Sequence, residues 1–200
     1  MMKIIHRINT HQHLLNVENI YGIEIDVRYH KNKLILHHDP FHHHESSETS
    51  FESLLKAYRL NGPIIINVKT EGIEQECIKL LKKYNVKNWF FLDLSMPYFV
   101  KYSNFAYEKK IEGFTKSNLA VRYSEHESID YALGFIGKVE WVWVDCFSKF
   151  VLTPTIYEIL KKHFKICLVS PELQNHPLGW IKLFKHQLIN FDIDAVCTKR

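Results

Sequence analysis

Short apolar runs recur along the chain and alternate with stretches in which apolar residues return every three or four positions. The short runs are rich in Ile, Val, Phe and Trp, which is typical of parallel strands buried on both faces. Eight of them are predicted to be strands: Lys3–His6, Ile23–Val27, Pro63–Val68, Trp89–Leu94, Leu119–Tyr123, Glu140–Asp145, Lys165–Ser170 and Ala195–Thr198.

The stretches between these runs carry helical periodicity. Ser50 is suited to cap the first of these helices, and Thr153 followed by Pro154 is typical of a helix start. Four helices are predicted from the spacing of apolar residues: Ser50–Leu60, Ile73–Tyr84, Thr155–Phe164 and Leu178–Leu188.

Strands that alternate with helices across 200 residues predict an α/β fold made of βα units. We expect a compact single-domain (β/α)8 TIM barrel over residues 1–200, without a helix after the eighth strand. An open doubly wound sheet is the alternative. It is disfavoured because the chain has only 7 glycines and no GxGxxG phosphate loop.

Composition narrows the class of protein. Hydrophobic residues make up 46% and charged residues 24% of the chain, which is the balance of an ordinary globular domain. The net charge of +4 is dispersed, so nucleic-acid binding gains no support. No apolar stretch approaches the roughly 18 residues of a membrane span. We expect no signal peptide, because Met1–Arg7 turns polar before an apolar region could form. With four cysteines and no CxxC, we expect reduced thiols and a cytoplasmic protein.

Two acidic residues lie two positions apart in the second predicted strand. Glu24 and Asp26 should point to the same face, because side chains alternate along a strand. If that face is buried, a divalent cation would remove the cost of keeping both ionised. If the strand lies at a solvated edge, the same pattern needs no metal, and spacing alone leaves both interpretations open.

A hairpin is predicted directly after this strand. Lys31–Lys33 has the composition of a turn, and Leu34–Leu36 is a short return strand. The return carries His37 and His38 back toward the two acids, and His6-Arg7 ends the first strand on the same side. Histidine exchanges protons near neutral pH, and one arginine guanidinium can bind two phosphate oxygens at once.

These motifs together resemble the glycerophosphodiester phosphodiesterase family. The likeness lies in the order of His6-Arg7, Gly22–Val27 with its Glu-x-Asp-Val, a short hairpin, and Leu36–Pro40 with its His-Asp. The resemblance is specific over the first forty residues. The alternation of predicted strands and helices extends it along the rest of the chain.

The resemblance implies a metal-dependent phosphodiesterase that binds Mg²⁺ or Ca²⁺ and acts on a small glycerol- or sugar-linked phosphodiester. It implies that Glu24 and Asp26 bind the metal. It also implies that His6 and His38 are the acid/base pair and that Arg7 binds the phosphate.

The chain departs from the family pattern at the third strand. The family has Glu-x-Lys there, whereas this chain has Asn67 and Lys69, so the lysine is kept and a carboxylate is replaced by an amide. Asn67 can still bind a hard cation through its oxygen, with one negative charge fewer. Ile8 stands where the family has a glycine after His-Arg.

Later strand ends carry further polar residues, as expected of an enzyme barrel. Arg122 and Lys199, together with Lys69 and Arg7, are predicted to bind the phosphate of the substrate. Trp141 and Trp143 are assigned to the core. The run His42–His44 favours a solvated loop over a second metal site. The other polar residues at strand ends are Asp93, Glu125, Asp145 and Glu172.

Two other functions stay open. One is a barrel metallohydrolase of another type that uses the histidines as ligands. The other is a catalytically weakened module that binds phosphate esters, which Asn67 makes conceivable.

Overall fold

The computed structural model describes residues 1–40 and 49–200. The chain forms two compact units, one of residues Ile5–Tyr102 and one of Met1–Ile4 with Ser103–Arg200. All eight predicted strands are present, with ends that differ by up to three residues from the prediction. One domain over residues 1–200 stays a prediction.

The unit Ile5–Tyr102 is built on three parallel strands and a hairpin. Strand β2 pairs in parallel with β4, and β4 pairs with β5. This unit holds Ile5, the last residue of β1 (Met2–Ile5), and the first part of α4 (Met96–Tyr107). Its other elements are α1 (His11–Leu15), β2 (Gly22–His30), β3 (Lys33–Leu36), α2 (Phe51–Ala57), β4 (Ile64–Val68), α3 (Glu74–Lys83) and β5 (Trp89–Leu92).

The predicted hairpin after the second strand is confirmed. Strand β3 pairs antiparallel with β2, from Val27 opposite Leu36 to His30 opposite Lys33. Lys31 and Asn32 both have positive φ, of 46° and 61°, which matches the twist of a two-residue hairpin turn. The turn thereby directs the residues after Leu36 back along β2.

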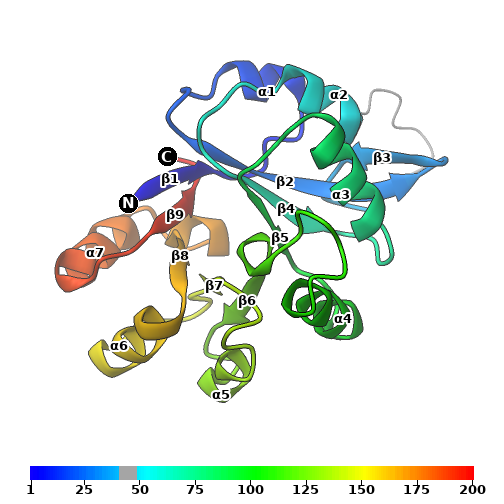
Figure 1. Cartoon of the computed structure of the whole chain (residues 1–200). Helices are drawn as coiled ribbons and strands as arrows, with labels where there is room; N and C mark the ends of the chain where they lie inside the picture. Colours follow the sequence, from blue (N-terminus) through cyan, green and yellow to red (C-terminus); the bar gives the residue numbers. More distant parts are fainter. Residues whose placement is uncertain (41–48) are drawn as a thin grey trace. The chain divides into compact units, whose positions relative to one another are not determined.

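The second unit continues the parallel arrangement. Strand β1 neighbours β9, and β9, β8, β7 and β6 follow in order. Helices α5, α6 and α7 lie along one side of these strands (Figure 1). The elements are η1 (Lys116–Asn118), β6 (Ala120–Tyr123), α5 (Ile129–Leu133), β7 (Trp141–Val144), α6 (Pro154–His163), β8 (Lys165–Val169), η2 (Pro171–Gln174), α7 (Gly179–Gln187), η3 (Leu188–Asn190) and β9 (Ala195–Thr198).

The predicted helix starts are confirmed. The side chain of Ser50 accepts a hydrogen bond from the backbone N–H of Ser53, and Thr153 accepts one from Ile156. Helices α1, α4 and α5 were not predicted. Helix α4 buries Phe99, Tyr102 and Ala106 at helical spacing, but its exposed side also carries apolar residues, so the periodic contrast is weak.

The interior of the described chain is mainly apolar, and its few buried polar side chains lie on strands, at strand ends and at some helical positions such as Glu74 and Ser103. All four cysteines are free and buried. Trp143 is buried, as the assignment to the core predicted, whereas Trp141 is only partly buried. Among the described residues, no helix has the length and apolar character needed to cross a membrane.

Candidate active site

Strand β2 carries two acidic side chains into the interior of the unit Ile5–Tyr102. Glu24 has no exposed surface and Asp26 is 1% exposed. Their spacing of two residues puts both on one face of the strand, with Ile25 on the other. The alternative of a solvated edge strand is therefore wrong, and two carboxylates lie in a place where ionisation is costly.

Each of these carboxylates has one oxygen engaged by the chain. The backbone N–H of Arg7 donates to Oε2 of Glu24 over 2.8 Å. The side-chain amide of Asn9 donates to Oδ2 of Asp26, also over 2.8 Å. The other oxygens, Oε1 of Glu24 and Oδ1 of Asp26, have no hydrogen-bond partner in the described part of the chain.

A third buried oxygen comes from the neighbouring strand. Asn67 on β4 lies opposite Asp26 in the parallel register, so both side chains are on the same face. Its Oδ1 is buried and likewise lacks a hydrogen-bond partner among residues 1–40 and 49–200. Buried oxygens normally form hydrogen bonds, so three on adjacent strands that form none in the described chain fit a site for a hard divalent cation, although Oδ1 of Asp26 also lies 3.6 Å from Nζ of Lys69.

The third donor is an amide instead of a carboxylate. Accordingly, the described residues include no group of three His, Cys, Asp or Glu side chains suited to a metal ion. Asn67, which replaces the carboxylate of the family pattern, thus lies beside the two acids in the structure as well. A cation held by Glu24, Asp26 and Asn67 would receive two negative charges from the protein.

Burial changes the electrostatics of this cluster. The pKa of Glu24 is raised to about 8, first because burial disfavours the charged carboxylate and second because Asp26 repels it. Lys69 offsets part of this charge, since its Nζ lies 3.6 Å from Oδ1 of Asp26. Without a cation, the cluster favours a proton on Glu24 at neutral pH.

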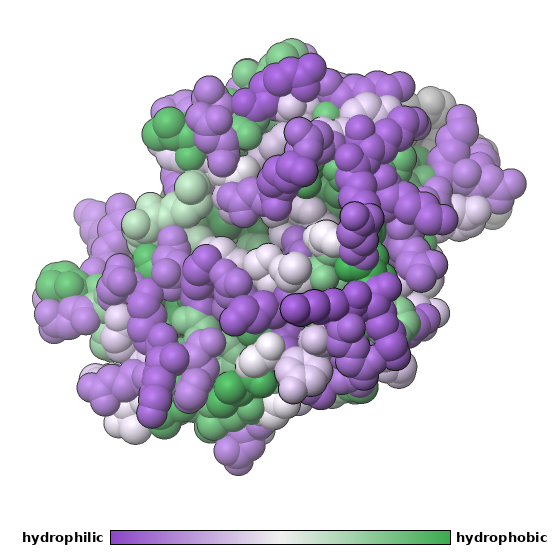
Figure 2. Space-filling view, viewed as in Figure 1, coloured by the Kyte–Doolittle hydropathy of each residue, from purple (hydrophilic) through white to green (hydrophobic). Residues whose placement is uncertain are grey.

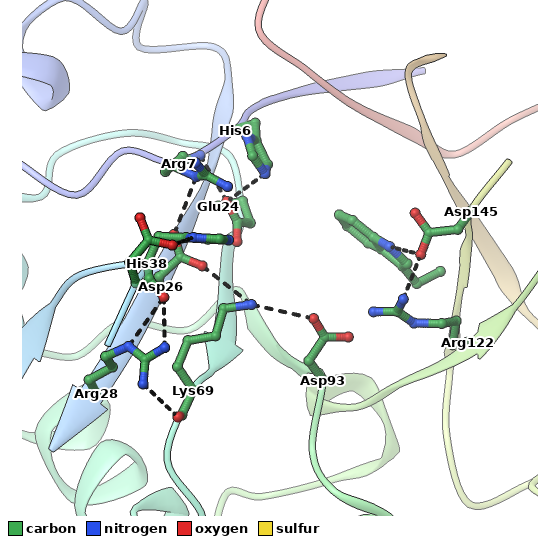
Figure 3. Close-up of polar contacts among 12 residues, drawn as sticks. His6, Arg7, Glu24, Asp26, Arg28, His38, Lys69, Asp93, Arg122 and Asp145 are labelled. Atoms are coloured by element: carbon green, nitrogen blue, oxygen red, sulfur yellow. Dashed lines mark hydrogen bonds and ion pairs between the residues drawn. The ribbon is translucent and has the colours of Figure 1, made fainter. Parts of the chain in front are cut away.

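His6 and Arg7 lie at the end of β1 beside the two acids (Figure 3). Nε2 of His6 is 3.6 Å from Oε2 of Glu24, and Nε of Arg7 is 3.7 Å from Oδ2 of Asp26. Arg7 has φ of 59°, a left-handed conformation that is uncommon outside glycine. Such outliers gather at functional sites, and here the turn aims both the N–H and the guanidinium of Arg7 at the acids.

His38 follows the end of the hairpin strand β3 (Figure 3). Its Nδ1 lies 2.8 Å from Oδ1 of Asp39, which lowers the pKa of Asp39 through the hydrogen bond. With Nδ1 bonded to a carboxylate, Nε2 is the ring nitrogen left for proton transfer. The backbone N–H of His37 donates to the carbonyl of Asp26, which ties the hairpin end to β2.

Two contributors were missed by the sequence reasoning. Asn9 forms a reciprocal pair with Asp26, since its Oδ1 also accepts the Asp26 backbone N–H. Arg28 donates to the carbonyl oxygens of His38 and Lys69. Arg28 continues the alternation of Glu24 and Asp26 and could have been found by that spacing. Asn9 lies 17 residues from its partner in a loop and has no local signal.

Lys69 lies between two carboxylates. Its Nζ is 3.7 Å from Oδ2 of Asp93 in addition to its contact with Asp26. Asp93 follows β5 and has φ of 59°, so it leaves the alternation of the strand. The sequence singled out Asp93 as a strand-end residue, and the structure places its carboxylate beside the lysine of the site.

The remaining predicted anion binders belong to the other unit. Nη1 of Arg122 is 3.0 Å from Oδ2 of buried Asp145. Asp145 also accepts hydrogen bonds from Trp143 and Gln174. The exposed side chain of Lys199 extends past β9. Phosphate binding by Arg122 and Lys199 stays a prediction.

The carboxylates at two later strand ends bind nearby backbone. Glu125 accepts hydrogen bonds from the N–H groups of Phe147 and Ser148, and Glu172 accepts one from Lys199. The predicted histidine loop His42–His44 lies outside the described residues.

Comparisons with known proteins identify the fold. No family model matches the chain, and no curated protein matches it in sequence. Two crystal structures are similar over 100% of this chain. One is a glycerophosphoryl diester phosphodiesterase from Parabacteroides distasonis, with a TM-score of 0.68, 12% identity and 82% of its own chain covered. The other is a glycerophosphodiester phosphodiesterase from Agrobacterium tumefaciens, with a TM-score of 0.69, 16% identity and 97% covered. The chain therefore has the (β/α)8 TIM-barrel fold of these proteins, as predicted, and not a doubly wound sheet.

Proposed function

We propose that this protein is a metal-dependent phosphodiesterase that hydrolyses a small glycerol- or sugar-linked phosphodiester. The observation that carries the proposal is the set of three buried oxygens without hydrogen-bond partners in the described chain, on Glu24, Asp26 and Asn67. They lie beside His6 and Arg7, and His38 follows the hairpin strand that pairs with β2. The fold is shared with two proteins named as phosphodiesterases.

The three oxygens would hold Mg²⁺ or Ca²⁺, and the bound cation would stabilise the negative charge of the phosphoryl oxygens. Arg7 and Lys69 would add two fixed positive charges around the same phosphate. Arg7 reaches Asp26 from the end of β1, and Lys69 reaches it from the end of β4, so the anion would be held between them.

The two imidazoles would move protons. One takes the proton from a neighbouring hydroxyl of the substrate alcohol, as that oxygen forms a bond to phosphorus. The other gives a proton to the leaving oxygen as its bond to phosphorus breaks, which leaves a cyclic phosphodiester. Water then adds to phosphorus and one ring P–O bond breaks, with the two histidines in exchanged roles, so that the hydrolysis is complete. His6, whose Nε2 lies 3.6 Å from Oε2 of Glu24, would be the proton donor. His38, with Nδ1 bonded to Asp39, is suited to be the base.

The test is hydrolysis of a p-nitrophenyl diester of glycerol phosphate with Mg²⁺, Ca²⁺ or Mn²⁺. An analogue that lacks the neighbouring hydroxyl shows whether the alcohol itself attacks. We expect turnover that EDTA abolishes and that His6→Ala and His38→Ala each reduce by roughly 10² or more. His163→Ala, at an exposed position of α6, is the matched control and should leave the rate unchanged.

A second function is favoured by one specific residue. Asn67 lowers the negative charge of the metal site, which suits a module that binds phosphate esters without hydrolysing them. That function predicts no turnover but thermal stabilisation by a phosphate ester in the presence of the cation. Metal-dependent turnover that survives both His6→Ala and His38→Ala would instead point to a metallohydrolase of another type.

A further inference from the structure

Helix α7 and the residues that flank it expose apolar and basic side chains side by side. Leu178, Leu183 and Ile189 are 52%, 59% and 70% exposed. Lys182 and Lys185 are exposed among them. Figure 2 shows apolar atoms directly beside hydrophilic ones over α7. The sequence between Glu172 and Asp192 contains no acidic residue, so the whole segment is basic.

The pattern follows one side of the helix. Leu178, Lys182, Lys185 and Ile189 are spaced by four, three and four residues, which puts them along one stripe. Phe184 lies on the opposite, buried side and anchors the helix in its unit. We call these four residues the α7 stripe. Its apolar members, Leu178 and Ile189, are exposed and lie outside the buried core of the unit.

A groove of about 390 Å³ runs beside the α7 stripe. Its walls come from α7, β8, β9 and the start of β1, all within one unit. Every charged residue that lines it in the described chain is basic. The lining includes apolar Leu168, Ile181, Phe184, Leu188 and Val196 and basic Lys3, Lys185 and Arg200.

The polar residues of the groove are already engaged. The hydroxyl groups of Ser170 and Thr198 both donate to Glu172. The Glu172 carboxylate also accepts the backbone N–H of Lys199, so its charge is bound within the fold. The groove is therefore lined mainly by apolar side chains, together with the basic side chains of Lys3, Lys185 and Arg200.

We propose that the α7 stripe and this groove dock the protein on a membrane surface that contains anionic lipid. Apolar side chains beside lysines are the combination that binds at the interface of such a membrane, where headgroups attract the lysines and the acyl region receives the apolar groups. A nucleic acid would use the lysines and leave the leucines in water. A symmetric pair of copies would bring together two basic surfaces without an acidic residue between Glu172 and Asp192 to offset their charge.

This inference is independent of the proposed reaction, since none of its residues belongs to the cluster around Glu24 and Asp26. The inference implies that the protein binds at the surface of the lipid bilayer. The proposed binding is peripheral, through exposed side chains of the α7 stripe.

The experiment is sedimentation of the full chain with sucrose-loaded vesicles. Vesicles of phosphatidylglycerol and phosphatidylcholine are compared with vesicles of phosphatidylcholine alone. We expect binding to the anionic vesicles only, weaker at high salt. Lys182→Glu with Lys185→Glu should weaken it by at least about 30-fold, since each basic residue near the surface contributes roughly fivefold.

Two further variants separate charge from apolar contact. Leu178→Ser with Ile189→Ser should weaken binding while keeping the fold, because both side chains are exposed. Lys79→Glu with Lys87→Glu, at exposed positions of the other unit, makes the same change in net charge and should have a much smaller effect.

The proposal is overturned by any of three results. The first is no binding to anionic vesicles, and the second is equal binding to both vesicle types. The third is an equal loss of binding in the Lys79 and Lys87 control. Light scattering adds a separate check, since a dimer that Leu178→Ser with Ile189→Ser converts to monomer would assign this face to a second copy instead.

Discussion

The guanidinium of Arg28 donates two hydrogen bonds to the backbone carbonyl oxygen of His38, from Nε over 3.2 Å and from Nη2 over 2.8 Å. Its Nη1 donates to the carbonyl of Lys69 over 3.2 Å. One side chain on β2 thereby holds two loop residues of the proposed site, one after β3 and one after β4. Arg28 touches neither side chain and acts as a positioning residue.

We expect Arg28→Lys to lower kcat by roughly 10- to 100-fold with a smaller change in KM. A lysine cannot serve both carbonyls in this geometry, and small displacements of a catalytic group are costly. Steady-state kinetics on the glycerol phosphate diester measure both constants. Arg59→Lys is the matched control, because exposed Arg59 also donates to a carbonyl, that of Tyr58. Equal losses in the two variants would contradict the positioning role.

The replacement Asn67→Asp should strengthen metal binding. The side chain keeps its size, while a third carboxylate joins Glu24 and Asp26 on the same face. We expect Ca²⁺ affinity in a calorimetric titration to rise by roughly tenfold, because affinity at oxygen sites follows ligand charge. The metal-free variant should unfold more easily, since like charges are added to a buried cluster.

Asn61→Asp is the control for this change, since Asn61 is exposed. It adds the same charge and should alter neither Ca²⁺ affinity nor stability by a comparable amount. Unchanged Ca²⁺ affinity in Asn67→Asp would remove position 67 from the metal site.

Asp93→Asn tests the environment of Lys69. Asparagine tolerates the left-handed backbone at this position, and the substitution removes one of the two carboxylates beside the Lys69 ammonium. We expect inorganic phosphate to bind roughly three- to fivefold more tightly, because a competing anion is lost. Titration of the protein with inorganic phosphate measures this affinity. Asp130→Asn, at an exposed position, should have no effect, and weaker phosphate binding in Asp93→Asn would refute the competition.

Glu74 makes stability depend on pH. It is 1% exposed at the start of α3, and both of its carboxylate oxygens lack a hydrogen-bond partner in the described chain. Burial raises its pKa above the usual 4.5. The folded protein therefore keeps the proton at pH values where the unfolded chain has lost it. Its stability should fall as the pH rises from about 4.5 through the raised pKa.

Glu74→Gln should remove this dependence. We expect the variant to gain free energy of unfolding relative to the parent at pH 8 and to gain less at pH 5, measured by urea denaturation. Glu76→Gln, on an exposed position of the same helix, should change stability little at either pH. A larger gain for Glu74→Gln at pH 5 than at pH 8 would reverse the assigned sign.

Much of the fold was readable from the sequence, because strands buried on both faces are continuous apolar runs and several helices have strong periodicity. Helix α4 was not, since Val100 and Tyr107 make its solvent side apolar too. In the site, alternation along β2 predicted the shared face of Glu24 and Asp26, and the resemblance to a family supplied His6, Arg7 and His38. The contacts of Asn9 and Asp93 depend on loop and left-handed conformations that no local pattern encodes.

The most direct measurement of the central claim is a crystal structure with Ca²⁺ and inorganic phosphate added. We predict an ion within about 2.3–2.6 Å of Oε1 of Glu24, Oδ1 of Asp26 and Oδ1 of Asn67, with a phosphate oxygen completing its shell. A structure in which saturating Ca²⁺ leaves these three oxygens without an ion, while phosphate binds elsewhere, would contradict the proposed metal site and the reaction built on it.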